Sequence, residues 1–161
     1  MKVSVFYLAI LLLSNCSITK EKNKFSGNWY TCANDGLYIE LLIKDNTFRY
    51  STCNGLVTKW YDYKINDDTL TYSDSYLYKD STIIKKALII HINKDVLIMD
   101  YITSKELWTF YKISENITDI DNADKLIKST KQRAQLYSCP DKRSTEEKAK
   151  DSVMKFIYFQ F

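Results

Sequence analysis

The sequence has little of what enzyme active sites and metal centres usually require. It contains one histidine, His91, together with one proline and three glycines. A general base must lie within hydrogen-bonding reach of its partner, and the strand face of His91 offers no acid or nucleophile, so we expect a structural or surface histidine. The chain also lacks a glycine-rich phosphate loop and any CxxC or zinc-ligand spacing. We therefore predict that the protein is not an enzyme and has no catalytic residue, metal site or cofactor.

An excess of positive charge is missing too. Lys and Arg number 23 against 20 Asp and Glu, a formal net charge of +3. A nucleic-acid surface needs a basic face that displaces counterions from phosphates, so we expect no nucleic-acid partner for a chain this nearly balanced. Asp67, Asp68 and Asp74 lie where the chain is expected to turn, which favours turn residues over paired catalytic carboxylates.

Aromatic residues, by contrast, are abundant, with 13 Tyr, 7 Phe and 3 Trp. These residues suit half-buried strands. Because proline and glycine are scarce, most turns have to be made by Asn, Asp and Ser. The strongest turn signals are Asn34-Asp35-Gly36 and Asn54-Gly55, each between segments in which apolar and polar residues alternate.

Residues 25–113 predict an all-β domain of about eight short antiparallel strands with no helix between them. We favour a closed barrel over an open sheet, because closure removes the exposed edge strands. The expected strands cover residues 27–31, 37–44, 47–53, 56–65, 69–73, 83–92, 96–102 and 106–113, with a weaker piece at 76–79.

The start of the chain predicts export. Lys2 is followed by an apolar run at residues 3–13, which is too short to span a bilayer and typical of a signal peptide. The run ends in Leu13-Ser14-Asn15-Cys16, which resembles the bacterial lipobox, although Asn15 stands where Gly, Ala or Ser is usual. The resemblance implies a signal peptide over 1–15, acyl chains such as palmitate on Cys16, and a tether to residue 24. The alternative is an ordinary secretory signal with an incidental cysteine.

The residue after the expected lipidation site bears on location. Ser17 resembles the residue found there in lipoproteins of the bacterial outer membrane. We therefore expect an exported protein attached to that membrane through Cys16, facing the periplasm or the cell surface.

Three further cysteines, Cys32, Cys53 and Cys139, would lie in an oxidising compartment, so a disulfide is expected. Three thiols allow three pairings. We favour Cys32–Cys53, because the two residues end the first and third expected strands at the same end of a meander. A bond to Cys139 would instead join the C-terminal segment to the barrel.

A family resemblance enters at Gly27-Asn28-Trp29, which resembles the GxW signature of lipocalins at the first strand. Asp100-Tyr101, between two late strands, resembles the second motif of the family, with Met99 where Thr is usual. The arginine that packs over the tryptophan in that family has no equivalent here, although Lys112 lies near the place. The closer resemblance is to the lipocalin-like domains of Bacteroidetes lipoproteins, and it covers residues 25–113.

This resemblance implies an antiparallel up-and-down lipocalin-like β-barrel with a C-terminal helical extension. Trp29 would then be the structural plug at the closed end of the barrel. Residues 114–161 would form a helical tail, with a helix over 119–137 that ends before Pro140. The apolar face of this helix is expected to comprise Ile120, Ala123, Ile127, Ala134 and Tyr137.

The last part of the tail carries two more signals. Ser144-Thr145-Glu146-Glu147 is a capping box, which predicts a second helix running to about Lys155. Residues 156–161 are strongly aromatic, and we expect them to pair with the barrel or pack against it as a final strand.

Two functions are consistent with these features. The first is binding of a small hydrophobic ligand in the barrel, because barrels of this size can hold one ligand among aromatic walls. The second is a non-enzymatic protein-interaction or inhibitor module of the cell envelope, with a filled barrel. An apolar void would favour the first function, and a packed interior with an exposed apolar patch the second. The residues expected to contact a ligand are Tyr50, Trp60, Tyr72, Trp108 and Phe110.

Overall fold

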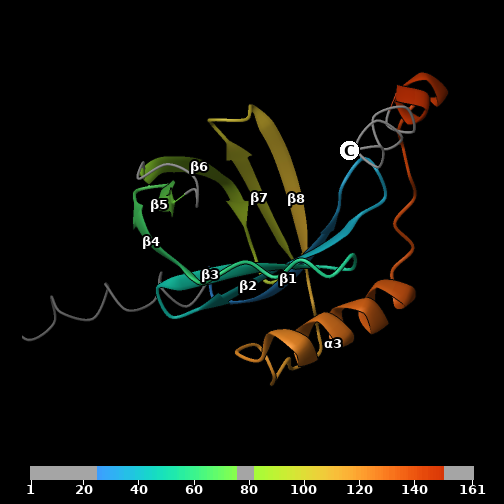
Figure 1. Cartoon of the computed structure of the whole chain (residues 1–161). Helices are drawn as coiled ribbons and strands as arrows, with labels where there is room; N and C mark the ends of the chain where they lie inside the picture. Colours follow the sequence, from blue (N-terminus) through green and yellow to red (C-terminus); the bar gives the residue numbers. More distant parts are fainter. Residues whose placement is uncertain (1–24, 76–81, 151–161) are drawn as a thin grey trace, which may run out of the picture.

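The computed structural model describes residues 25–75 and 82–150, which form a closed barrel of eight antiparallel strands with a helix outside it (Figure 1). Each strand pairs with its neighbours in the chain, and β1 pairs with β8. The strands are β1 (Gly27–Cys32), β2 (Tyr38–Lys44), β3 (Thr47–Thr52), β4 (Tyr61–Asn66), β5 (Thr69–Ser75), β6 (Thr82–Ile92), β7 (Val96–Tyr101) and β8 (Glu106–Lys112). The helix is α3 (Ala123–Leu136). The predicted all-β barrel with a C-terminal helical extension is confirmed.

Two turns use aspartates that the sequence indicated, whereas Asp74, expected in a turn, lies within β5 and pairs with Ile83 of β6. Asp45, between β2 and β3, has φ 55°, and Asp67, between β4 and β5, has φ 53°. Aspartate tolerates this left-handed region better than most residues. Asp67 is therefore a turn residue, as predicted. The weaker strand expected at 76–79 lies outside the described residues.

The fourth strand is shorter than predicted, because residues 56–58 make only an isolated bridge to β3, at Val57, and β4 begins at Tyr61. Trp60 packs in a second apolar cluster on the outside of the barrel. The Arg49 guanidinium lies 5.0 Å from the centre of the Trp60 ring, and its Nη2 donates to the carbonyl of Thr58 at 2.6 Å. The Arg49 guanidinium therefore holds the Trp60 ring, together with the backbone at Thr58, on the outside of the barrel.

The barrel interior is filled with large side chains. The ring of Phe48 lies 4.9 to 6.0 Å, centre to centre, from four tyrosine rings. Burial of these aromatic and aliphatic surfaces is the main stabilising contribution to the barrel. The buried members of this cluster are Phe25, Trp29, Leu41, Ile43, Phe48, Tyr63, Leu70, Tyr72, Ala87, Leu97, Met99 and Phe110.

Trp29 lies fully buried at the end of the barrel where β1 begins. Lys112 Nζ sits 4.3 Å from the centre of its ring and donates to the carbonyl of Ser26 at 3.0 Å. A Cβ atom at Gly27, whose φ is 133°, would lie 1.8 Å from that nitrogen. The glycine therefore leaves the space in which the lysine covers the tryptophan, and the partial burial lowers the pKa of Lys112.

The disulfide joins Cys32 to Cys139, and Cys53 is a free thiol, so the favoured Cys32–Cys53 pairing is wrong. Cys32 pairs with Tyr38 across one strand boundary, and Cys53 N–H donates to the Tyr38 carbonyl across the next. Two strand spacings separate the cysteines by about 10 Å, which exceeds the reach of a disulfide. The bond to Cys139 brings the two Cα atoms to 5.3 Å and joins the tail to the barrel.

Helix α3 is held to the outer wall by a buried ion pair. Glu40, on the outward face of β2, has no exposed surface. Arg133 donates to both of its carboxylate oxygens, from Nε at 2.6 Å and from Nη2 at 2.8 Å. Thr130 Oγ1 and the Tyr38 hydroxyl each add a hydrogen bond of 3.0 Å. Burial alone lowers the pKa of Arg133, but the hydrogen bond and charge of Glu40 raise it by more.

This ion pair also sets which face of α3 is buried. The buried residues are Leu126, Thr130 and Arg133, whereas the predicted apolar residues are at most half-buried and Ala123 is exposed. The helix is rotated relative to the expectation because its polar residues are needed over the Glu40 carboxylate. It begins one residue after Asn122, whose side chain accepts from Lys125 N–H at 3.0 Å.

The disulfide predicts a clear difference between two cysteine substitutions. Cys139→Ser opens a bond that spans 107 residues, so we expect the free energy of unfolding to fall by about 2–5 kcal/mol. Cys53→Ser removes a thiol that makes no disulfide and should change it by less than about 1 kcal/mol. Urea denaturation of both variants is the measurement. Equal losses would contradict the Cys32–Cys139 assignment.

The ion pair predicts a second contrast. Arg133→Met leaves Glu40 buried without its partner and should lower the free energy of unfolding by about 3–5 kcal/mol, whereas adding Glu40→Leu to it should restore most of the loss. The matched control is Lys44→Met, which breaks an exposed pair with Asp121 at 3.4 Å. That change is expected to cost under about 1 kcal/mol in the same urea titration. A loss as large for Lys44→Met would show that burial is not the cause.

Candidate binding site at the seam between β1 and β8

The predicted ligand contacts divide between two places. Tyr72 and Phe110 are buried in the barrel interior, and Tyr50 and Trp108 pack against that cluster half-buried. Trp60 lies outside the barrel, as described above. The interior cavity measures about 10 Å³, which is about the space of one water molecule. A ligand inside the barrel would therefore require these side chains to move apart.

Two tyrosines make a polar contact in the interior. The hydroxyls of Tyr50 and Tyr101 lie 2.5 Å apart. Burial raises the pKa of both phenols above the ordinary value near 10. The pair is therefore neutral at physiological pH and satisfies its own hydrogen bonding inside the apolar cluster.

A much larger concavity lies where β1 and β8 separate, and its lining includes Trp108, which also packs against the interior cluster. These strands pair only at Trp29 with Lys112 and at Tyr30 with Tyr111. Beyond those positions they diverge, and Figure 1 shows the two ribbons meeting at the base of β8 and separating above it. The cleft between them has a volume of about 1110 Å³. We call it the seam cleft.

The direction of the peptide groups beside the seam cleft follows from two hydrogen bonds. Ile113 N–H donates to the carbonyl of Asn28 on the β1 side, and Lys112 N–H donates to that of Asp95 on the β7 side, each at 2.9 Å. Peptide groups alternate between the two sides along a strand. Odd-numbered residues of β8 therefore direct their peptide groups towards β1.

By this alternation, Leu107 and Thr109 present their N–H and C=O groups to the seam cleft. Cys32 does the same from the facing edge of β1, because it lies an even number of residues from Asn28. The pairing of β1 with β8 does not extend to any of these three positions. The seam cleft is therefore bordered on both sides by strand-edge peptide groups that the β1–β8 pairing does not use.

Aromatic rings line the cleft close to the point where β1 and β8 pair. The ring of Tyr30 lies 4.1 Å from that of Tyr137 and 5.7 Å from that of Tyr111, centre to centre. Tyr137 is the residue at which α3 ends. Burial, followed by the neighbouring Tyr137 and Tyr111, raises the pKa of Tyr30.

The far wall of the cleft is the segment after α3, and it is fixed to the β1–β2 loop. The Cys32–Cys139 bond holds it at one point, and Lys142 N–H donates to the Asn34 carbonyl at 2.8 Å. A Cβ atom at Gly36, whose φ is 84°, would lie 3.1 Å from the Cys139 carbonyl oxygen. The glycine therefore permits this close approach of the two backbones.

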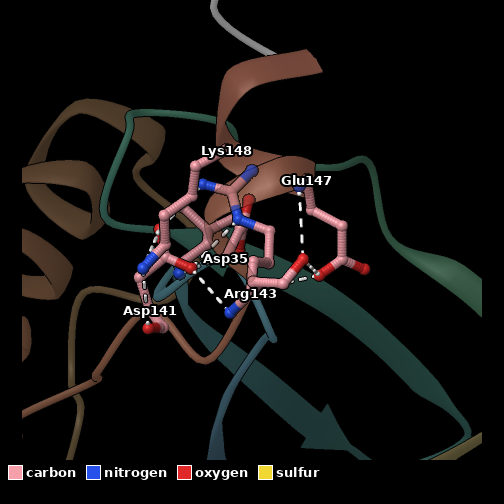
Figure 2. A network of polar contacts seen from close by, with 7 residues as sticks. Asp35, Asp141, Arg143, Glu147 and Lys148 are labelled. Atoms are coloured by element: carbon pink, nitrogen blue, oxygen red, sulfur yellow. Dashed lines mark hydrogen bonds and ion pairs between the residues drawn. The ribbon is translucent and has the colours of Figure 1, made fainter.

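A network of charged side chains surrounds Arg143, which lines the cleft, and Figure 2 shows Arg143 beside Asp141 and Glu147. Arg143 donates to both carboxylate oxygens of Asp141 at 3.0 and 2.9 Å, and these bonds lower the pKa of Asp141. Ser144 N–H donates to Glu147 at 2.7 Å, and Glu147 N–H returns a bond to the Ser144 hydroxyl at 3.3 Å. This is the predicted capping box, and residues 145–150 are helical. The expected continuation to Lys155 lies outside the described residues.

The exposed apolar residues support the choice of this site. Leu107, Tyr111 and Leu136 line the seam cleft and expose 64%, 48% and 71% of their surfaces. Strand β6 also exposes Ile84 and Ile90, and it pairs with β5 over residues 82–88 and with β7 over residues 87–92. The seam cleft thus combines exposed apolar side chains with unpaired strand edges.

The remaining polar candidates are peripheral. His91 is exposed, and its Nε2 lies 2.9 Å from the Asn93 side-chain nitrogen. Among residues 25–75 and 82–150, no group of three or more His, Cys, Asp or Glu side chains is placed to hold a metal ion. Comparison with protein-family models, curated proteins and solved structures found no match to this chain.

Sequence reasoning identified only Trp108 of the residues that line this cleft. Tyr30, Leu107 and Tyr137 carried no signal, because the cleft depends on where β1 and β8 stop pairing and on the bond to Cys139.

The Tyr50–Tyr101 pair predicts an alkaline limit to stability. In the unfolded chain both phenols ionise near pH 10, whereas burial raises their pKa values in the fold. Their contribution to stability is therefore complete below about pH 10 and is lost as the pH rises above it. We expect a Tyr50→Phe, Tyr101→Phe variant to show a shallower fall in the free energy of unfolding between about pH 10 and 12. Identical slopes for the two proteins would contradict the burial effect.

Proposed function

We propose that this protein is a non-enzymatic, lipid-anchored binding protein of the bacterial envelope, which binds an extended polypeptide segment of an envelope partner in the seam cleft. The observation that carries the proposal is the cleft of about 1110 Å³ between the edges of β1 and β8, which is far larger than the interior cavity of about 10 Å³.

An extended segment suits the cleft for two reasons. Main-chain hydrogen bonds to the edges at Cys32, Leu107 and Thr109 supply affinity, and pockets for alternate side chains supply specificity. The exposed side chains of Leu107 and Tyr111 supply apolar contact area at the same place.

A small hydrophobic ligand is the second candidate. The aromatic rings of Tyr30, Tyr111 and Tyr137 favour it in the seam cleft, since small-molecule sites are lined mainly by such side chains. The small interior cavity of about 10 Å³ argues against a ligand site inside the barrel. A small hydrophobic ligand would not need main-chain hydrogen bonds to the strand edges, whereas an extended peptide would. This difference separates the two candidates.

The location in the envelope rests on the export signal. Cys16 and the rest of residues 1–24 lie outside the described residues, so the lipid anchor stays a prediction. In the part of the chain that the structure describes, no helix is long and apolar enough to cross a membrane. The anchor would hold the seam cleft near other envelope proteins.

Binding of a defined peptide tests the proposal. The probe is a capped hexapeptide of alternating Val and Thr, titrated by calorimetry into residues 17–150, which retain every described residue. We expect Thr109→Pro to weaken binding by about tenfold or more, because it removes an amide facing the cleft, and Thr109→Val to leave binding unchanged. An N-methylated form of the peptide should not bind.

Oleate separates the second candidate in the same experiment. Binding of oleate without binding of the hexapeptide would support a small-ligand function and exclude the strand-binding one. Circular dichroism of the Thr109 variants establishes that they fold. Equal affinity for Thr109→Pro and Thr109→Val would contradict binding at this edge.

A further inference from the structure

The first residues of β8 bring an acidic group and aromatic rings together at the seam cleft. Glu106 lies opposite Tyr101 of β7, and Trp108 lies opposite Met99, which is buried in the barrel. Residues directly opposite each other on antiparallel strands direct their side chains to the same face of the sheet. Alternate residues of one strand also share a face. Glu106 and Trp108 are therefore on the interior face of β8, and both line the seam cleft.

The carboxylate of Glu106 is held beside these rings. Trp108 Nε1 donates to Glu106 Oε2 at 3.1 Å, and the Trp108 ring lies edge-on to that of Tyr101 with 6.3 Å between the ring centres. Burial is the main cause that raises the pKa of Tyr101, and the charge of Glu106 raises it further. Among the ion pairs of residues 25–75 and 82–150, none includes Glu106. Its second oxygen, Oε1, can therefore accept from a cation in the cleft.

The other charged residues that line the cleft lie away from β8. Asp35 is in the β1–β2 loop, where it accepts from a backbone N–H at 3.0 Å. Lys142 and Arg143 belong to the far wall, and Arg143 is paired with Asp141 at 2.9 Å. On the β8 side, Glu106 is the charged residue of the lining. A segment that pairs with the edge of β8 thus meets a negative charge there.

The geometry of an added strand fixes where that charge acts. A strand bonded to the peptide groups of Leu107 and Thr109 continues the sheet, so every second residue of it faces the same side as Glu106 and Trp108. A basic side chain at such a position meets the carboxylate across neighbouring strands, and this pairing is favourable. The ammonium or guanidinium group also interacts favourably with the face of a tryptophan ring. An acidic side chain at the same position meets a like charge.

We propose that Glu106 is the specificity-determining residue of the seam cleft and selects a partner segment that carries a Lys or Arg side chain beside β8. This inference rests on the proposed function, because it names the chemistry of the segment bound at the same site. Trp108 is a positioning residue, since its indole N–H orients the carboxylate. Leu107 is exposed on the opposite face, so apolar residues on either side of the basic one complete the segment.

Calorimetry with three related peptides tests the proposal in residues 17–161. A central Val of the Val-Thr hexapeptide is replaced by Lys, Met or Glu, and the similar lengths of Lys and Met isolate the effect of charge. We expect the Lys peptide to bind about fivefold more tightly than the Met peptide, and the Glu peptide more weakly than either. The preference for Lys should shrink in about 0.5 M salt, because salt screens the attraction.

The ratio of the Lys and Met affinities is the readout for the variants, because a general change in the cleft alters both affinities alike. Glu106→Gln removes the charge and retains an oxygen that can accept from Trp108, and it should bring the ratio close to one. Trp108→Phe keeps a ring without the N–H and should lower the ratio in part. The matched control is Glu146→Gln, which removes an exposed carboxylate 3.9 Å from Lys150 and should keep the ratio.

The outcomes separate this inference from the proposed function. If the three peptides bind with equal affinity, the cleft binds strands without selecting charge, so the inference is overturned and the proposed function stands. A preference for Lys that survives Glu106→Gln would overturn the assignment to this residue. If none of the peptides binds, the strand-binding function fails and the inference fails with it. A preference lost with Glu106→Gln and kept with Glu146→Gln supports both.

Discussion

The buried carboxylate of Glu40 is the constraint on which the rest of the structure depends. A charge on the outer wall of the barrel is stable there only if another element covers it and satisfies its oxygens. Arg133 and Thr130 do so from α3. The position of α3 in turn brings Tyr137 onto Tyr30 and carries the chain to the disulfide at Cys32. One ion pair thereby places the far wall of the seam cleft.

The two ends of the β1–β8 seam differ for physical reasons. At one end, Lys112 covers the buried Trp29, and Gly27 leaves room for it, so the strands are held together. At the other end, the tail is fixed to the β1–β2 loop and β8 diverges from β1. With much of the interior filled by aromatic rings, a cleft of about 1110 Å³ opens in this divergence, and Trp108 lines it from the barrel side.

Much of the fold could be predicted because its signals are local. Alternation located the strands, and the turns at Asp45, Asp67 and Gly55 followed from residues that tolerate a positive φ. The errors concern relations between elements. The expected Cys32–Cys53 bond placed together residues on strands two apart, which the spacing of a sheet keeps separate. Trp60 was assigned to the interior because its strand looked continuous, whereas Arg49 holds it outside.

By itself, the sequence determined the class of fold, the number and order of the strands, and the presence of a helical tail, since these depend on periodicity and turn chemistry within short stretches. Only the tertiary structure decided which face of α3 is buried, which cysteines pair, and where the barrel leaves strand edges exposed. Those outcomes depend on contacts between distant residues, such as Glu40 with Arg133 and Cys32 with Cys139. No pattern of neighbouring residues encodes such contacts, because they arise when separate elements compete for the same surface.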